Sequence, residues 1–155
     1  MIVLRMAHGV RSHFTLRLSE WLMIYPAIGM WIAFQMQPQM FSLSSSFAVL
    51  DRWADEMTWA WLVLCCALAR LVALTVNGSF KTFPYSPHMR LGAAFIGIAF
   101  WSQFALGFVL AYLATGSALS AVFAYTTFCL AELANIYRTW GDVAAGWSQT
   151  SRQGR

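Results

Sequence analysis

Two long segments of this sequence carry almost no charge. Across residues 91–137 the only charged side chain is Glu132, and across residues 60–89 the only ones are Arg70 and Lys81. Charged residues make up 10% of the chain, whereas a soluble domain has about 25%. A soluble fold would expose these apolar segments to water, so the sequence predicts an integral membrane protein.

The apolar segments are long enough for four helical crossings of a membrane. A helix needs roughly 17 to 25 residues to cross the hydrocarbon layer, and its backbone hydrogen bonds are then all internal. We therefore expect an all-α fold, a four-helix transmembrane bundle within residues 18–140. The first span contains Pro26 and Gly29, which predict a kink in its middle. The predicted spans are residues 18–36, 58–76, 89–113 and 118–137.

The segments outside the spans differ in character. Residues 1–17 mix apolar side chains with arginines, which is typical of a short amphipathic segment on a membrane surface. A signal peptide is the alternative, but no cleavage motif of small residues follows the first apolar segment. Residues 47–57 are amphipathic and place acidic side chains before the second span, where the helix dipole favours them. Residues 141–155 are polar and predict a mobile tail.

Local signals predict where the helices end. Residues 37–46 are rich in Gln and Ser and predict a polar loop. Asn77 and Gly78 together predict a helix stop. Ser86 followed by Pro87 predicts an N-cap and the first residue of a helix, and residues 115–117 predict a tight turn.

Lysine and arginine are distributed unequally between the two sides of this topology. Eight lie on the side that holds both termini, and only Arg52 lies on the other. Because the side richer in these residues faces the cytoplasm, we predict an N-in, C-in, multi-pass protein of a bacterial inner membrane. The cytoplasmic set is Arg5, Arg11, Arg17, Lys81, Arg90, Arg138, Arg152 and Arg155, and we expect the first six at the membrane interface.

Arg70 and Glu132 are ionisable side chains inside predicted spans, where a charge is costly. Both spans run outward to inward in this topology. Arg70 lies seven residues before Asn77, and Glu132 lies six before Arg138. At about 1.5 Å of rise per residue the two lie at nearly the same depth, so we predict a direct ion pair. The pair either fixes the helix register or belongs to an ion or proton path.

Further polar and small residues lie within the spans. Asn135 and Arg138 follow Glu132 at intervals of one turn, and Gln103 lies near the middle of the third span. We expect these groups to line a polar strip inside the bundle or to form interhelical hydrogen bonds. Small residues four apart indicate close packing of helices or self-association. The pairs are Gly29/Ala33, Ala93/Gly97, Gly107/Ala111, Ser117/Ala121 and Ser120/Ala124.

No set of residues indicates catalysis, a metal or a cofactor. The three histidines lie outside the spans, so a transmembrane haem has no axial ligand. The three cysteines lie inside the spans without a CxxC pair, and we interpret them as small packing residues. Nucleotide-binding and hydrolase motifs are absent, and the basic residues form no dense patch for nucleic acid. The histidines are His8, His13 and His88, and the cysteines are Cys65, Cys66 and Cys129.

Three segments of the predicted spans and their ends are Ala69–Gly78, Ser86–Arg90 and Ala131–Arg138. They resemble small multi-span membrane proteins encoded by tailed phages and prophages, and the resemblance covers residues 57–142. Such phage proteins include holins, which assemble into inner-membrane lesions at lysis, and superinfection-exclusion proteins. A holin-like resemblance implies self-association through the spans and a polar C-terminal tail. Many holins have fewer than four spans, and the chain departs from them in that respect.

The predicted function is that of a non-enzymatic, self-associating, holin-like protein that permeabilises the membrane. One alternative is a superinfection-exclusion or regulatory protein that binds a host membrane protein. Another is a small channel or transporter subunit that uses Arg70, Gln103, Glu132 and Asn135. The expected partners are the lipid bilayer and either copies of the chain or another membrane protein, and no nucleic acid.

Overall fold

The computed structural model describes residues 14–79, 83–116 and 119–153, and these residues form helices and short connections without a strand. Three helices are long: α6 (Glu56–Ser79), α7 (Ser86–Thr115) and α8 (Leu119–Gln153). Each contains a segment long and apolar enough to span a membrane. The all-helical fold and the membrane-protein class are as predicted. Residues 1–13 of the predicted segment 1–17, which include Arg5 and Arg11, lie outside the described residues, and so does Lys81.

The segment predicted as the first span is two helices rather than one kinked helix. The 3-10 helix η1 (Thr15–Arg17) leads into α2 (Leu18–Leu22), and after Met23 the chain continues as α3 (Ile24–Met36). Pro26 explains the position of the break, because it has no N–H to donate to the carbonyl of Leu22 four residues earlier. Gly29 lies within α3 without interrupting it.

Short helices form a cap between α3 and α6. They are α4 (Met40–Leu43), the 3-10 helix η2 (Ser45–Phe47) and α5 (Ala48–Trp53), so the prediction of a loop over 37–46 is wrong in part. The carboxylate of Glu56 accepts hydrogen bonds from the backbone N–H groups that begin α4, at 3.2 and 3.4 Å. The indole N–H of Trp59 donates to the carbonyl of Leu50 at 3.1 Å, which ties α5 to α6.

The ends of the long helices differ in detail from the prediction. Asn77 and Gly78 do not stop α6, which continues through Ser79. Tyr85 is the N-cap of α7 and Ser86 its first residue. The Ser86 hydroxyl donates to the side-chain oxygen of Asn77 at 2.8 Å. Gly116 ends α7 in the left-handed conformation (φ 73°), with its N–H bonded to the carbonyl of Tyr112, so the predicted turn begins as expected.

The last helix is longer than predicted. We expected the fourth span to end near residue 137 and a mobile tail to follow, but α8 continues to Gln153 without a break. Residues 141–153 therefore belong to the same helix as the predicted fourth span. The apolar part of α8 is Leu119–Ala145.

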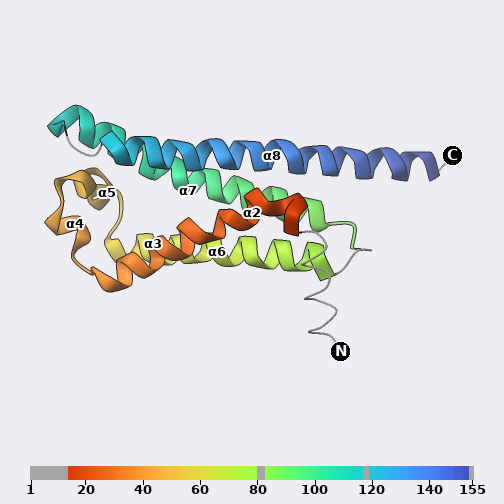
Figure 1. Cartoon of the computed structure of the whole chain (residues 1–155), viewed down its shortest axis with the longest axis horizontal. Coiled ribbons are helices and arrows are strands. Elements are labelled where there is room, and N and C mark those ends of the chain that lie inside the picture. The colour runs from red at the N-terminus through yellow and green to blue at the C-terminus, as the bar shows by residue number, and fades with distance from the viewer. Residues whose placement is uncertain (1–13, 80–82, 117–118, 154–155) are drawn as a thin grey trace.

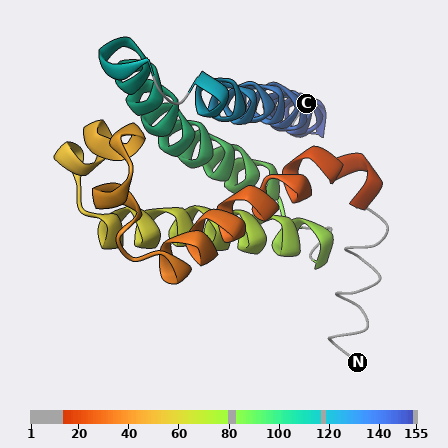
Figure 2. The ribbon, with the colours of Figure 1, turned by 60° about the vertical axis from the view of Figure 1, so that its left-hand side comes forward.

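The long helices lie side by side in the order α3, α6, α7, α8 (Figures 1 and 2). α3 runs along α6, and α7 lies between α6 and α8. α8 therefore lies at the edge of the molecule, where α7 is its main neighbour. α2 turns away from this arrangement and contacts both α6 and α8.

Aromatic side chains fill the half of the molecule near α4 and α5. The ring of Phe104 is fully buried, with its centroid 5.0 Å from that of Trp59 and 5.4 Å from that of Tyr125. Trp101 lies 4.9 Å from Phe128. Because each aromatic ring buries a large apolar area, this cluster is the main apolar core that joins α6, α7 and α8.

Candidate functional site

Buried polar side chains follow one face of α8 from near its middle toward its C-terminus. Glu132, Asn135 and Thr139 are at most 1% exposed, and Asp142 lies one turn further on. Steps of three, four and three residues place all four on the same helix face. Buried polar groups require hydrogen-bond partners, and each of these four side chains has at least one.

Arg70 and Glu132 form the ion pair that their equal depth predicts. The Nη2 atom of Arg70 lies 2.6 Å from Oε1 and 2.5 Å from Oε2 of the carboxylate, and it also donates to the carbonyl of Ala93 at 3.3 Å. The side chains are 5% and 1% exposed. Since α7 separates α6 from α8, the two side chains meet over α7 at Gly97, where an added Cβ would overlap the Glu132 carboxylate.

Asn135 extends this pair toward α2. Its side-chain nitrogen donates to Oε2 of Glu132 at 3.3 Å, and its side-chain oxygen accepts the hydroxyl of Ser19 at 2.8 Å. Arg138 in turn donates to the Ser19 hydroxyl oxygen at 3.1 Å. The predicted polar strip thus includes Asn135 and Arg138. It does not include Gln103, which is exposed on α7, so that part of the prediction is wrong.

A second group of charges surrounds Arg90. Arg90, which we expected at the membrane interface, is 2% exposed because its guanidinium is enclosed by carboxylates. Its Nε and Nη2 atoms lie 2.9 and 2.5 Å from the two oxygens of Glu20, and its Nη1 atom lies 2.9 Å from Asp142. Arg17 lies 2.8 Å from Asp142 and 3.8 Å from Glu20. These four side chains alternate in sign, and we call them the charge ring.

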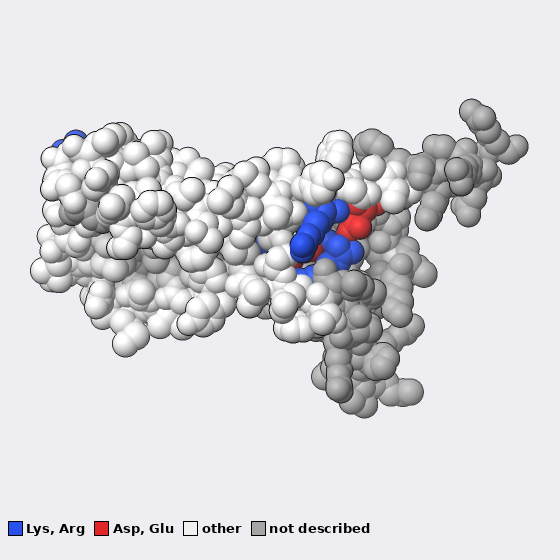
Figure 3. Space-filling view, turned by 45° about the horizontal axis from the view of Figure 1, so that its top comes forward, with Lys and Arg blue, Asp and Glu red and all other residues white. Residues whose placement is uncertain are grey.

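The charge ring reaches the surface, whereas the Arg70–Glu132 pair does not. The side chains of Asp142 and Arg17 are 37% and 21% exposed, and charged side chains of both signs gather on one face of the molecule (Figure 3). Asp142 lies about 15 Å along α8 from Glu132. Glu132 is thirteen residues from either end of Leu119–Ala145, so the polar groups extend from the surface to the middle of this span.

The buried charged side chains extend no further than the depth of Glu132. Among the described residues, every buried charged side chain lies at Arg70, at Glu132 or on the side of them nearer α2. On the other side Trp101, Tyr125 and Phe128 pack together. Within one copy of the chain, the interior between α2 and the Arg70–Glu132 pair is therefore polar. Beyond that pair, packed aromatic rings fill the interior.

The reasoning from sequence missed half of the charge ring and the role of Ser19. A signal was present: Glu20 is an ionisable residue inside the predicted first span, the same feature that identified Arg70 and Glu132. The helical spacing of Asp142 from Glu132 was a second signal. Neither signal predicts which arginine each acid contacts.

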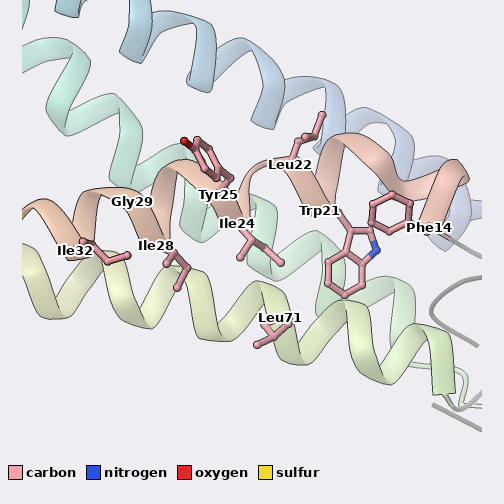
Figure 4. A pocket seen from close by; sticks show the side chains of 9 residues that line it. All are labelled: Phe14, Trp21, Leu22, Ile24, Tyr25, Ile28, Gly29, Ile32 and Leu71. Carbon is pink, nitrogen blue, oxygen red and sulfur yellow. The ribbon is translucent and has the colours of Figure 1, made fainter. Parts of the chain in front are cut away.

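An apolar groove lies between the α2–α3 segment and α6 (Figure 4). Its volume is about 460 Å³, and its walls include Phe14 and Trp21 at one end, Ile28 and Ile32 along α3, and Leu71 of α6. The groove offers almost no polar atom, so it has no group for chemistry or for orienting a polar ligand. No group of three metal-binding side chains occurs in the described part of the chain, and its cysteines are free thiols.

Comparison of the chain with protein-family models, with curated proteins and with solved structures found no match.

Proposed function

We propose that the chain is a four-span protein of a bacterial inner membrane that self-associates and permeabilises it, in the manner of a phage holin and without catalysis. The observation that carries this proposal is the exposure of α8. In the 18-residue apolar stretch of each long helix, only 11% of α8 is buried within the chain, compared with 39% of α6 and 44% of α7. A helix this exposed has most of its surface available to lipid or to a second copy.

The fourth crossing in this proposal is formed by α2 and α3 together. Residues 18–36 would extend over about 28 Å as a straight helix, close to the hydrocarbon thickness, and the break at Met23 shortens this span. α3 alone has 13 residues and is too short. α3 lies antiparallel to α6 along most of its length (Figure 1), and its exposed side chains include Ile32 and Tyr25. Both termini then lie on the side rich in arginine, which is the cytoplasm by the positive-inside rule.

The outward face of α8 is suited to helix association. Ser120, Ala124, Thr127, Ala134 and Gly141 are exposed along α8, and small residues allow two helices in a membrane to approach closely. The hydroxyl of Thr127 donates to the carbonyl four residues earlier, at 2.8 Å. It therefore needs no water or further partner, and its methyl group is available for packing.

The closed interior favours an assembly over a channel within one copy. The polar groups stop at the Arg70–Glu132 pair, and aromatic rings occupy the space beyond. Permeation by ions or larger solutes would then need a path between copies. This is our reason to prefer holin-like assembly over a single-copy transporter.

The test is controlled expression in bacteria with a co-expressed endolysin. We expect an abrupt stop in growth followed by lysis. Ala134→Phe on the exposed face of α8 should delay or abolish lysis at equal protein level, whereas Val72→Phe on the exposed face of α6 should not. Growth without lysis would contradict the proposal. Resistance to phage DNA injection would then favour the exclusion protein, and liposome ion flux lost in Glu132→Gln would favour the channel.

The topology is tested separately by reporter fusions. Fusions after residue 155 and within residues 37–46 should report cytoplasmic and periplasmic locations, respectively. A periplasmic location for the C-terminal reporter would contradict the proposed orientation whatever the outcome of the lysis test.

A further inference from the structure

α2 is joined to the rest of the molecule by a break in the helix. Met23 separates it from α3, and the carbonyl of Leu22 lacks the usual donor because residue 26 is proline. On either side of Met23 the chain takes different directions. α3 follows α6, whereas α2 turns toward α8 (Figures 1 and 2). A break between two rigid segments is the local structure from which hinges are built.

Two sets of polar contacts hold α2 in this position. The Ser19 hydroxyl donates to Asn135 of α8 at 2.8 Å. Glu20 forms a two-point contact with the buried guanidinium of Arg90 on α7, and Arg90 also binds Asp142 of α8. Arg138 of α8 also donates to the Ser19 hydroxyl oxygen at 3.1 Å. Without the polar contacts of Ser19 and Glu20, α2 would be held by the adjoining chain and its apolar side chains.

α2 also lies over the polar interior. Ser19 contacts Asn135, and the amide of Asn135 contacts the Glu132 carboxylate that binds Arg70. α2 contacts α6 and α8, the two helices that carry this ion pair. We propose that α2 is a hinged lid over the Arg70–Glu132 pair and that the charge ring is its latch. When the lid opens, water and small ions reach the pair from the side of the membrane that α2 faces.

The latch has a weak side. Glu20 and Arg90 are buried, whereas Asp142 and Arg17 are partly exposed. The Nε atom of Arg17 is buried and has no hydrogen-bond acceptor among the described residues, so this donor does not stabilise the closed lid there. Because water competes for the Asp142 contacts, we expect opening to begin there.

Opening of the lid can be measured by the labelling of a cysteine at position 139, which is Thr139 in the chain. Thr139 is fully buried on α8 between Asn135, which contacts α2, and Asp142, which contacts η1. Its hydroxyl donates only within α8, to the carbonyl of Asn135 at 2.6 Å, so Thr139→Cys leaves the latch intact. The variant is placed in the full chain after replacement of the three native cysteines by alanine. Labelling by a membrane-impermeant maleimide is measured in membrane vesicles of both orientations.

We expect slow labelling at position 139 with the latch intact and an increase of about tenfold in Asp142→Asn, which weakens the ring but keeps the side-chain shape. Asp142→Glu retains the charge and should label within about twofold of the parent. Asp51→Asn is the matched control, since Asp51 is exposed and forms no ion pair in the part of the chain that the structure describes. Its labelling rate should not change.

Two results would overturn the lid. One is an Asp142→Asn rate within about twofold of the parent. The other is an equal gain at a Val63→Cys reporter in the apolar core, since Val63 is fully buried and its labelling would indicate general loosening. The inference does not depend on holin-like activity and uses the proposed topology only to assign a side. Labelling confined to right-side-out vesicles would show that α2 faces the periplasm. That result would contradict the proposed topology but not the lid.

Discussion

Gly97 of α7 lies directly against the carboxylate of Glu132 on α8. A Cβ atom at position 97 would overlap this carboxylate and would lie 3.0 Å from Nη2 of Arg70. α7, which lies between α6 and α8, therefore has a glycine at the point where the Arg70–Glu132 ion pair passes over it. The small size of this residue permits the contact between Arg70 and Glu132.

Gly97→Ala should destabilise the protein. The methyl group has to displace the ion pair from its position over α7, and overpacking of this kind costs about 1–3 kcal/mol in the free energy of unfolding. The measurement is reversible unfolding in mixed micelles. Gly92→Ala is the matched control on the same helix, because an added Cβ there meets nothing within 4 Å. Equal effects of the two substitutions would contradict the close approach at Gly97.

Loss of one partner of the buried ion pair should cost more than loss of both. Glu132→Gln or Arg70→Met leaves a buried group without its counter-charge, and we expect a loss of about 3–5 kcal/mol in the free energy of unfolding. The double variant Arg70→Met/Glu132→Leu should be less destabilised than either single variant. In the reversed pair Arg70→Glu/Glu132→Arg, stability should be partly restored. Failure of the reversed pair to improve on either reversal alone would contradict the contact.

Leu50 and Gly107 form the corresponding contact at the other end of α7. Leu50 is fully buried in the cap, and an added Cβ at Gly107 would lie 2.8 Å from its Cγ atom. Gly107→Ala should therefore destabilise the protein by about 1–3 kcal/mol, and Leu50→Ala by about 2–5 kcal/mol. In the double variant the new methyl group partly fills the space that Leu50 leaves, so the cost should be smaller than the sum. Strict additivity would show that the two residues do not touch.

Asp55 should show a pH effect at the start of α6. Hydrogen bonds from the Thr58 hydroxyl and the Thr58 backbone N–H, the latter at 2.8 Å, hold the pKa of this carboxyl below its ordinary value. Because the pKa is lower in the folded state, the stabilisation is present above the ordinary aspartate pKa. It is lost as the pH falls through the lowered value. Carboxyl chemical shifts measured against pH should show the lowered midpoint.

Thr58→Val separates the two hydrogen bonds to Asp55. It removes the hydroxyl and keeps the backbone N–H, so the pKa of Asp55 should move part of the way back toward its ordinary value. Asp55→Asn, which does not titrate, should remove this contribution from the dependence of stability on pH. An unchanged pKa in Thr58→Val would contradict the role of the hydroxyl.

Reasoning from sequence succeeded where the relevant physics is local or lies along a helix axis. Hydropathy predicted the helical membrane-protein class, because a backbone in lipid has to satisfy its own hydrogen bonds. The constant rise per residue predicted that Arg70 and Glu132 share a depth and meet, although α7 lies between their helices. Pro26 predicted a kink and Gly116 a tight turn, and the structure has a helix break before Pro26 and a helix end at Gly116, for reasons that involve only neighbouring residues.

Only the tertiary structure decided which way each side chain faces. Gln103 and Arg90 both lie on α7, yet Gln103 is exposed and Arg90 is enclosed by Glu20 and Asp142. Their depth follows from position in the sequence, but their direction around the helix axis depends on where α2, α6 and α8 pack. The sequence by itself therefore determined the class of fold and the depth of the buried charges. The packing of neighbouring helices decided their partners, because a helix has no inward side until another helix covers it.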